Sequence, residues 1–550
     1  MSKLFSFLFV VILVVGAILG GLFGRSSALT INSDASTPLE KVRSDYSEAV
    51  KVVTENYAGA VDFEKVTEDS VQGMLYTLDP HSSFFTRTEF QKLAEDQSSR
   101  FYGIGVSILQ HRNGVYVQSV VQDTPAQRAG LRYGDRFLEV DGKDATQWTS
   151  QEVSKNVRGE RGAPVHLKVE RAGAAKPVEL DIVRDAVPYP SIRNTFMIRP
   201  GIGYIGFTGG FQETSDKELS ESIRALKANG MKQLVLDLRG NPGGLLPQAI
   251  AVTSRFIQNG KVVTSVRGRS KGIRSEELKS NNSNPEDFPL VVVINGFTAS
   301  ASEIVSGAVQ DYGRGLIVGE TSFGKGLVQR VFQLPMGTGL TLTTARYYTP
   351  FGRSLQRDYS NGSIYDYYTR HTDDAENNGK AAPTPTPTGA PVTTAGGRIF
   401  YGGGGIEPDV KVAQLTGTPL RARIAEAAFY FTRQLAAGQV AGLENYHVER
   451  QQFDHELRAT DFPITDKVLE AFRAFIAKDD AQGLKSENLN GELEFTKTRL
   501  REEMITAAYS SETGQQVLLD VDPQILKAIE VLPESKKLAE SVKLSLKQNG

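Results

Sequence analysis

The chain has 550 residues, of which 40% are hydrophobic and 23% are charged. Single domains commonly hold about 100–200 residues, so we expect roughly three or four domains with cores of their own. The 62 Lys and Arg residues nearly balance the 64 Asp and Glu residues, and a net charge of −2 argues against nucleic acid as a partner. Without cysteine the chain has no disulfide, cysteine nucleophile or thiolate metal site. This absence does not identify the compartment, because exported proteins also occur without disulfides.

An uncharged apolar run from Leu4 to Phe23 lies between Lys3 and Arg25. It is longer than the core of a usual signal peptide, about 7–15 residues, and close to the roughly 20 residues that span a bilayer. We therefore expect residues 1–30 to be a signal peptide or a membrane anchor, and the protein to be exported. Cleavage after Ala28 and retention as an anchor both remain open.

Residues 36–97 have the apolar spacing of helices and begin with a capping signal. The run Asp79-Pro80-His81-Ser82 is typical of a helix exit followed by the cap of the next element. No second histidine or acidic cluster lies near His81 in the sequence, so we interpret His81 as structural.

Residues 98–186 alternate apolar and polar residues around Gly and Asp turns, which predicts a small module of strands with one or two short helices. The runs FYGIG and TPAQRAGLRYGDRFLEVDG resemble a bacterial PDZ domain. In that family the loop matching Tyr102, Gly103, Ile104 and Gly105 offers backbone N–H groups to the terminal carboxylate of a peptide, which adds a strand to the sheet edge.

Strand and helix patterns alternate from residue 190 onward, as in GIGYIGFTGGF, DKELSESIRALKANG, KQLVLDLRG and PLVVVING. This alternation predicts an α/β domain whose functional loops follow the strand ends. None of the six histidines lies between residues 190 and 360, so a Ser-His-Asp triad cannot be built within this domain. A serine can instead be activated by a neutral amine.

Lys325 has suitable surroundings for such an amine, because FGKGLV is apolar and the nearest acidic residue in sequence is Glu320. Lysine starts near pKa 10.4, and lowering it by about three units through burial costs roughly 4 kcal/mol. Gln329, four residues later, shares a face with Lys325 if the segment is extended, and its amide would then orient the amine.

Ser300 falls where the strand PLVVVING leads into the helix SEIVSGAVQDYG, so its hydroxyl is expected at a helix amino terminus. Free N–H groups at such a terminus favour an oxyanion. The N–H of Ala301 is one candidate donor, and the loop GNPGG offers a second through Gly243 or Gly244.

Each of these features also has an ordinary structural explanation. Small residues in TASASE permit close helix packing, GNPGG is a common turn, and a Gly-Lys-Gly turn is frequent at surfaces. Ser302 and Glu303 are interpreted as residues of the first helical turn, not as catalytic residues. Only the combination of a serine, a lysine and a glycine loop favours a catalytic site.

NGFTASASEI, DYGRGLIVGETSFGKGLVQ, LVLDLRGNPGGLL and LTTARYYTPFGRSLQ closely resemble the carboxyl-terminal processing (tail-specific) protease family, as do RGERGAPVHLKV and LDPHSSFF. The resemblance covers about residues 36 to 412. It implies a multidomain α/β chain with a crotonase/ClpP-like protease core at residues 190–371 and 398–412. It also implies a serine endopeptidase with a Ser300/Lys325 dyad, Gln329 in support, and Ala301 and Gly243 as oxyanion donors, without metal or cofactor.

Two regions depart from the family pattern. Residues 372–397 are rich in Pro, Thr and Gly, which predicts an insertion that is disordered or forms a flexible loop. Residues 417–550 are helical and charged, and both a partner-docking or dimerisation bundle and simple packing against the protease core remain open.

The leading interpretation is an exported protease of the bacterial periplasm or the outer face of the inner membrane, which cleaves extracytoplasmic proteins near their carboxyl termini. Its expected partners are proteins or peptides with free carboxyl termini, and the membrane through the amino-terminal segment. An activating adaptor protein and a homo-oligomer stay open. The alternatives are a membrane-tethered, inactive PDZ adaptor and an acyl-transfer or hydratase enzyme. The PDZ-like module either gates the site, with Arg158 as a candidate contact to the protease, or tethers substrate.

Overall fold

The structure is a computed structural model that describes residues 37–269, 275–359, 367–368, 389–478 and 483–548. The chain divides into two compact units, Met1–Val71 and Gln72–Gly550. The apolar run of the amino terminus and most of the insertion expected at residues 372–397 lie outside the described residues. A search of the described residues finds no helix long and apolar enough to cross a membrane.

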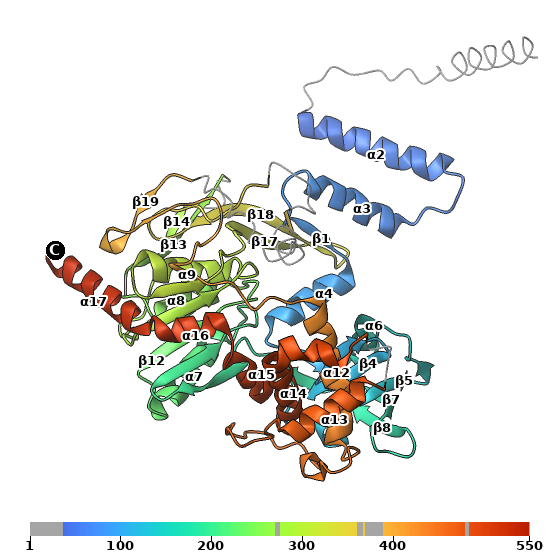
Figure 1. The fold of residues 1–550 in the computed structure, drawn as a ribbon. Coiled ribbons are helices and arrows are strands. Elements are labelled where there is room, and N and C mark those ends of the chain that lie inside the picture. The colour runs from blue at the N-terminus through green and yellow to red at the C-terminus, as the bar shows by residue number, and fades with distance from the viewer. Residues whose placement is uncertain (1–36, 270–274, 360–366, 369–388, 479–482, 549–550) are drawn as a thin grey trace, which may run out of the picture. The chain divides into compact units, whose positions relative to one another are not determined.

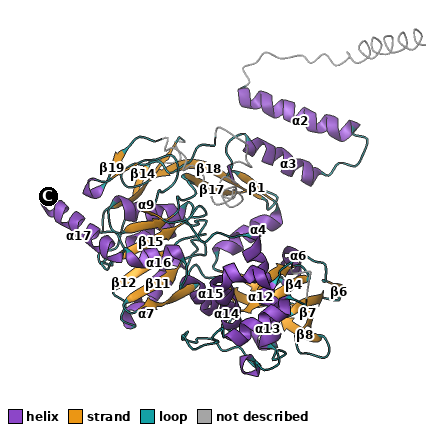
Figure 2. Ribbon diagram, viewed as in Figure 1, coloured by secondary structure: helices purple, strands orange, loops and turns teal. Residues whose placement is uncertain are grey.

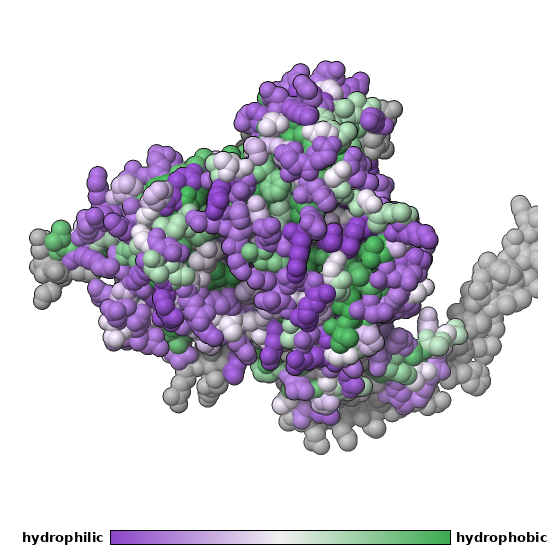
Figure 3. Space-filling view, turned by 90° about the horizontal axis from the view of Figure 1, so that it is seen from below, coloured by the Kyte–Doolittle hydropathy of each residue, from purple (hydrophilic) through white to green (hydrophobic). Residues whose placement is uncertain are grey.

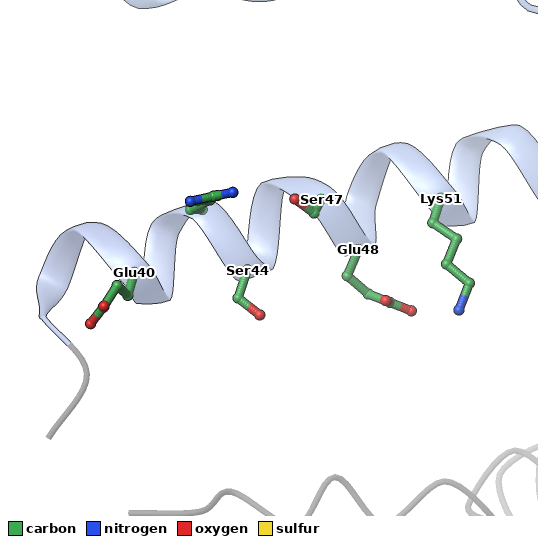
Figure 4. A pocket seen from close by; sticks show the side chains of 6 residues that line it. Glu40, Ser44, Ser47, Glu48 and Lys51 are labelled. Atoms are coloured by element: carbon green, nitrogen blue, oxygen red, sulfur yellow. The ribbon is translucent and has the colours of Figure 1, made fainter. Parts of the chain in front are cut away.

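The described part of the first unit is helical, as the sequence predicts (Figure 1). Helix α2 (Pro38–Asn56) begins with a capping box, in which the Thr37 N–H donates to the Glu40 carboxylate at 2.7 Å and the Glu40 N–H donates to the Thr37 hydroxyl at 3.3 Å. Helix α3 (Phe63–Tyr76) starts in the same unit. Polar side chains line a shallow pocket on one face of α2 (Figure 4): Glu40, Arg43, Ser44, Ser47, Glu48 and Lys51. Such side chains are typical of a solvated helix face, and we assign no function to this pocket.

The PDZ-like module of the second unit is a twisted antiparallel sheet with two short helices. Its sheet has the order β3-β4-β5-β7-β8, with β6 on β5. The elements are β3 (Val106–His111), β4 (Gly114–Val120), α5 (Pro125–Ala129), β5 (Arg136–Val140), β6 (Lys143–Asp144), α6 (Ser150–Val157), β7 (Pro164–Glu170) and β8 (Val178–Val183). A two-stranded ribbon of β2 (Arg100–Gly103) and β9 (Asp185–Pro188) joins the chain where it enters and leaves the module.

The protease core is built on a six-stranded sheet of order β10-β11-β12-β15-β16-β21. All neighbours are parallel except β10 and β11. The strands are β10 (Asn194–Arg199), β11 (Ile202–Gly206), β12 (Gln233–Asp237), β15 (Leu290–Ile294), β16 (Leu316–Gly319) and β21 (Val410–Lys411). Five buried residues in a row make β15 apolar throughout, as expected for a parallel strand covered on both faces.

Alternate residues of these strands enter two different cores. Leu236 of β12 and Val292 of β15 pack with helices α7 (Ser215–Ala228), α8 (Leu246–Ser254) and α9 (Ala301–Asp311). Val235 and Val293 face the other way and pack against residues of α16 (Pro523–Glu530). The carboxy-terminal region therefore covers the second face of the protease sheet.

A second sheet carries the remaining site residues. Its order is β1-β18-β13-β14, with β17 paired to β18. The strands are β1 (Ser83–Phe85), β13 (Val262–Gly268), β14 (Glu276–Lys279), β17 (Leu327–Gln333) and β18 (Gly339–Tyr348). Strand β1 precedes α4 (Arg87–Gln97) in the region 36–97, for which we expected a helical pattern. That expectation is wrong for residues 83–85, because their backbone pairs with β18 of the protease.

Helices of the carboxy-terminal region also pack against the PDZ-like module (Figure 2). The helices are α12 (Pro419–Ala436), α13 (Asp466–Ile476), α14 (Leu493–Ala508), α15 (Ser511–Leu519), α16 (Pro523–Glu530) and α17 (Leu532–Gln548), with 3₁₀ turns η2 (Glu444–Tyr446) and η4 (Ser486–Glu492). Phe429 of α12 stacks on His111 with ring centroids 4.1 Å apart, and the buried Glu503 of α14 accepts a hydrogen bond from the Tyr133 hydroxyl at 2.6 Å. Of the two roles left open for this region, packing within the chain is the one observed.

Ordered structure begins before the predicted end of the insertion. Strand β19 (Val392–Thr393) pairs with β20 (Ile399–Phe400) around the short turn η1 (Ala395–Gly397). The expectation of disorder up to residue 397 is therefore wrong for these last residues, since backbone pairing orders them. The face displayed in Figure 3 is mostly hydrophilic, with smaller hydrophobic areas, as is usual for a protein surface.

Candidate active site

Ser300 lies at the turn between β15 and α9, as the sequence predicts. Its backbone has φ 56° and ψ −114°, a sparsely populated conformation for any residue other than glycine. Strained residues of this kind concentrate at active sites, and a sharp strand-to-helix turn is the usual way to present a nucleophilic serine. The local backbone therefore presents Ser300 at the amino terminus of a helix.

The glycine loop runs directly against this turn. A Cβ atom placed on Gly243 would lie 2.6 Å from Cβ of Ser300 and 2.9 Å from the backbone nitrogen of Ala301. Only a residue without a side chain fits there, because contacts under 3.0 Å are not tolerated. The loop and the start of α9 are thus brought together as the sequence predicts.

The assignment of donors within the loop needs correction. The N–H of Gly243 donates to the side-chain oxygen of Asn241 at 2.9 Å, so it is already engaged. Among the described residues, the N–H groups of Ala301 and Gly244 have no hydrogen-bond partner. Ala301 and Gly244, the alternative to Gly243, are therefore the donors available to an oxyanion.

Lys325 is half-buried in the turn before β17. Burial lowers the pKa of its amine, while the carboxylates of Glu303 and Asp79 offset part of that change. The amine donates to the side-chain oxygen of Gln329 at 3.1 Å, which is the contact that the four-residue spacing predicts. A lysine with a lowered pKa can serve as a general base.

Glu303 connects the two predicted catalytic residues. One of its carboxylate oxygens accepts the backbone N–H of Ser300 at 2.8 Å and that of Lys325 at 2.9 Å. The other accepts the Gly324 N–H at 2.8 Å and the Ser322 hydroxyl at 2.5 Å. The side chain is completely buried, and burial raises the pKa of Glu303 while these hydrogen bonds counteract the rise.

The sequence interpretation of Glu303 was incomplete. The residue does lie in the first turn of α9, as predicted, but it also fixes the backbone positions of Ser300 and Lys325. The signal that pointed to it is the capping-box spacing, with a glutamate three residues after a serine at a helix start. Its contacts to the lysine turn have no local sequence signature.

Gln329 is oriented by the segment that contains His81. Its amide nitrogen donates to the backbone carbonyl of His81, which leaves the amide oxygen facing the amine of Lys325. The carboxylate of Asp79 holds this segment by accepting the backbone N–H groups of His81 and Ser82 at 2.8 and 2.9 Å. The DPHS run therefore supports the site through its backbone.

The ring of His81 is not available as a base. Burial, with further contributions from Lys325 and Arg357, lowers the pKa of His81 to about 3. Its ring nitrogens are 2.8 Å from the Tyr367 hydroxyl and 3.3 Å from the Tyr368 hydroxyl. The imidazole is thus neutral and engaged by tyrosines, in agreement with its structural interpretation.

Ser300 and Lys325 are neighbours without a direct bond between their side chains. Tyr347 of β18 is buried beside both, with its hydroxyl donating to the Lys325 carbonyl and lying next to the Ser300 side chain. Within the described part of the chain, no hydrogen bond joins the Ser300 hydroxyl to the Lys325 amine. Catalytic hydrogen bonds often form only when substrate is bound, so this geometry is compatible with a dyad.

A groove lies between β3 and α6 of the PDZ-like module. Its lining residues are Phe101, Ile104, Gly105, Val106, Ile108, Phe137, Val153, Ser154, Val157 and Arg158. Gly105 has φ 88°, and a Cβ atom there would lie 2.3 Å from Thr124. Among the described residues the N–H groups of Ile104 and Gly105 have no partner. These two amides are free to bind a carboxylate.

The remaining residues predicted for this module lie elsewhere. Tyr102 and Gly103 belong to β2 and pair with β9, so they fall outside the groove lining. Arg158 stacks over the ring of Phe101 at 4.2 Å and lines the groove. Its expected contact with the protease is absent from the described interactions, because its side chain packs within its own module. Nor do the described residues contain a group of three His, Cys, Asp or Glu side chains able to hold a metal ion.

Comparison with known proteins defines the class of this chain. The family model of peptidase family S41 matches residues 201–368, and the model of the PDZ domain matches residues 103–182. The chain thus has the fold of a protease that carries a PDZ domain, in agreement with the fold predicted from sequence.

Similar proteins agree with this class. A carboxy-terminal-processing protease of Bartonella bacilliformis is 36% identical over 353 residues, which cover 63% of this chain and 80% of the relative. The carboxy-terminal processing protease CtpA of Bacillus subtilis is 32% identical over 356 residues, covering 64% and 75% of the two chains. A solved photosystem II D1 C-terminal processing protease is 30% identical, with a TM-score of 0.35 over 58% of this chain and 84% of that one. This chain belongs to the carboxy-terminal processing serine proteases of peptidase family S41.

Proposed function

We propose that this protease is exported and cleaves extracytoplasmic proteins near their carboxyl termini with Ser300 as nucleophile and Lys325 as general base. The observation that carries the proposal is the buried carboxylate of Glu303, one oxygen of which accepts the backbone N–H groups of both residues. This oxygen therefore holds Ser300, which has a strained backbone at a helix start, close to Lys325, whose amine has a pKa lowered by burial.

The chemistry follows from these positions. The neutral Lys325 amine takes the proton of the Ser300 hydroxyl while the oxygen attacks the scissile carbonyl. The N–H of Ala301, with a second N–H from the glycine loop, stabilises the oxyanion. The lysine then gives its proton to the leaving amine, and an acyl-enzyme forms. Lys325 next removes a proton from water, which attacks the ester. The lysine then gives this proton to the departing Ser300 oxygen, so that the acid is released and the free serine is restored.

Gln329 keeps the lysine in the orientation that this proton transfer needs. Because its amide nitrogen is bound to the His81 carbonyl, its oxygen can only accept from the amine. Substrate binding must bring the amine within hydrogen-bond reach of the Ser300 hydroxyl, which the resting geometry does not yet do.

The test replaces the serine and its neighbour. Ser300→Ala should abolish cleavage of a peptide substrate and leave thermal unfolding nearly unchanged, since the side chain is small. Ser302→Ala is the matched control, because Ser302 makes one 3.2 Å hydrogen bond to the Asn241 carbonyl, a contact worth about 1 kcal/mol. Retained cleavage by Ser300→Ala, or loss only in Ser302→Ala, would contradict the assignment. Cleavage by the wild-type protein that is lost in Ser300→Ala would also distinguish an active protease from an inactive adaptor.

The PDZ domain is proposed to capture the substrate's terminal carboxylate at the amides of Ile104 and Gly105. Arg158 beside the groove adds a positive charge for the same carboxylate. Arg158→Ala should weaken cleavage of a long substrate with a free terminus, whereas Arg161→Ala, an exposed partner of Asp185 in the same turn, should not. If amidation of the substrate terminus changes nothing, carboxylate capture is wrong.

Gating and tethering predict different results for a peptide too short to reach the groove. Under gating, Arg158→Ala alters turnover of the short peptide, whereas under tethering only the long substrate is affected. Point substitutions are preferable to deletion of the module, because deletion would expose Phe429 and remove the Tyr133 hydrogen bond to the buried Glu503.

The proposed location is the bacterial periplasm or the outer face of the inner membrane. Its support is the apolar run from Leu4 to Phe23 between Lys3 and Arg25. Cell fractionation, with sequencing of the mature amino terminus, tests the location and decides between cleavage after Ala28 and an anchor.

A further inference from the structure

The loop that follows β12 is anchored from the carboxy-terminal region as well as from its own core. Arg239 lies at the start of this loop, with a side chain only 16% exposed. Its guanidinium donates to both carboxylate oxygens of Asp237, at distances from 2.7 to 3.1 Å. A third nitrogen donates to Asp522 at 2.7 Å and to the side-chain oxygen of Gln524 at 2.9 Å. Arg239 thus links the loop to a segment 283 residues away.

The two distant partners are themselves held in place. One carboxylate oxygen of Asp522 caps α16 by accepting the N–H groups of Gln524 and Ile525 at 2.9 and 3.2 Å, and the other faces Arg239. Gln524 is fully buried, and its amide nitrogen donates to the Val412 carbonyl at 2.8 Å. This bond fixes the amide so that its oxygen points to Arg239. Helix α16 also packs on the protease sheet, so packing as well as hydrogen bonds holds Asp522 and Gln524 in place.

The same loop determines where the oxyanion donors stand. The backbone carbonyl of Asn241 accepts the Ala299 N–H at 3.0 Å, directly before Ser300. The side chain of Asn241 accepts the Gly243 N–H at 2.9 Å, and Gly244 follows. A shift of Arg239 would move the loop relative to the serine, and an error of about 1 Å in such a site can cost about a hundredfold in rate.

We propose that Asp522 and Gln524 are positioning residues for the oxyanion-binding loop, acting through Arg239. The carboxy-terminal region is then part of the catalytic unit, although both residues lie outside the part of the chain that the peptidase family model matches. The inference rests on the proposed function, because it requires an oxyanion bound between this loop and Ala301.

Two substitutions remove the anchor by different chemistry. Asp522→Asn keeps the helix cap, since asparagine caps as well as aspartate, but removes the charge that faces Arg239. Gln524→Met keeps the approximate volume and removes the acceptor. Asp520→Asn is the matched control, because Asp520 pairs with Arg199 on an exposed part of the same segment. Ser300→Ala is measured alongside in the full-length protein.

For Asp522→Asn and Gln524→Met we expect kcat on a short peptide to fall by about 10- to 100-fold, with KM changed less than about twofold. The reason is that the oxyanion donors stabilise the transition state more than the bound substrate. Affinity for a peptide boronate, which forms a tetrahedral adduct with the serine, should fall in parallel. Asp520→Asn should behave as wild type, and the two anchor variants, which lose buried hydrogen bonds, are assayed at temperatures where they remain folded.

The inference is overturned if kcat stays at the wild-type level in both anchor variants while Ser300→Ala is inactive. It is also overturned if KM rises with kcat unchanged, or if the loss of kcat occurs equally in Asp520→Asn. Activity in Ser300→Ala would instead refute the proposed function itself. If a variant has a lowered thermal midpoint, its boronate affinity is measured at a temperature where the variant is folded. A purely structural role of the residue would leave that affinity at the wild-type value, whereas a positioning role lowers it.

Discussion

Replacing Glu303 with glutamine removes a carboxylate that accepts the backbone N–H groups of both proposed catalytic residues. Its two oxygens accept four hydrogen bonds, from the Ser300, Gly324 and Lys325 N–H groups and from the Ser322 hydroxyl. A glutamine offers one oxygen and one NH₂ group that cannot accept. The substitution must therefore leave at least one buried donor without an acceptor.

The least costly arrangement turns the NH₂ group toward Ser322 and Gly324. The Ser322 hydroxyl already accepts the Ile406 N–H at 2.7 Å, and accepting from the NH₂ group as well leaves its own hydrogen without an acceptor. The Ser322 hydroxyl and the Gly324 N–H therefore both lose their acceptor, at a cost of about 1–3 kcal/mol each. The two bonds that remain, to Ser300 and Lys325, lose their charged acceptor, about 1 kcal/mol each. Glutamine is neutral, so the variant no longer bears the cost of burying the Glu303 charge, which offsets part of this sum. We expect a net loss of about 2–4 kcal/mol in the free energy of unfolding.

The same substitution shifts the pH dependence of catalysis. The Glu303 carboxylate raises the pKa of Lys325 against the larger lowering by burial, so removing the charge should lower that pKa further. The acid limb of the pH profile of kcat should then move to lower pH, while the maximum kcat falls because Ser300 and Lys325 are held less firmly.

The assay combines urea unfolding with peptide turnover measured across pH. Glu320→Gln is the control, because Glu320 lies five residues before Lys325 and, among the described residues, accepts a single hydrogen bond, from the Gln414 N–H at 3.1 Å. An acid limb that stays in place, or that moves to higher pH, would refute the electrostatic part of the reasoning. An unchanged free energy of unfolding would refute the hydrogen-bond part.

Three further predictions concern single groups. Wild-type kcat should rise with pH through the lowered pKa of Lys325, because only the neutral amine is a base. Lys325→Arg should be inactive at every pH, since guanidinium stays protonated. Turnover by the arginine variant would exclude the general-base role. Gln329→Ala should lower kcat by about tenfold, the scale of one orienting hydrogen bond, and an unchanged kcat would mean that the amide does not orient the amine. Burial and the neighbouring Glu503 raise the pKa of Glu502. Above pH about 4.5 the folded state therefore binds more protons than the unfolded state. The free energy of unfolding should then fall with rising pH until the raised pKa is passed. Burial also raises the pKa of Glu503, so Glu502→Gln should show a shallower fall in urea titrations, and an identical slope in both proteins would contradict the prediction.

Local sequence patterns predicted the parts of the site that lie within one segment. Ser300 is found at a strand-to-helix turn because an apolar strand and a helical period meet there, and Lys325 contacts Gln329 because both belong to one extended stretch. The resemblance to a protease family is confirmed by the comparisons. These features depend on neighbours along the chain, which periodicity and motif spacing report.

Contacts between distant segments could not be predicted in the same way. The His81 carbonyl orients Gln329 across 248 residues, and Arg239 reaches Asp522 across 283. Backbone carbonyls carry no residue-type signal, and a charged pair that forms only after folding leaves no local pattern. The assignment of Gly243 failed for a related reason, because the Asn241 side chain that engages its N–H could not be placed from sequence.

The catalytic roles of Ser300 and Lys325 are tested most directly by identifying the residue that a serine-directed fluorophosphonate modifies in the active protease. With Ser300 as nucleophile and Lys325 as base, mass spectrometry should find a single adduct on Ser300, formed faster as pH rises through the pKa of Lys325 and strongly slowed in Lys325→Ala. An adduct on Ser302 or another serine would contradict these roles. So would labelling of Ser300 at a rate independent of both pH and Lys325.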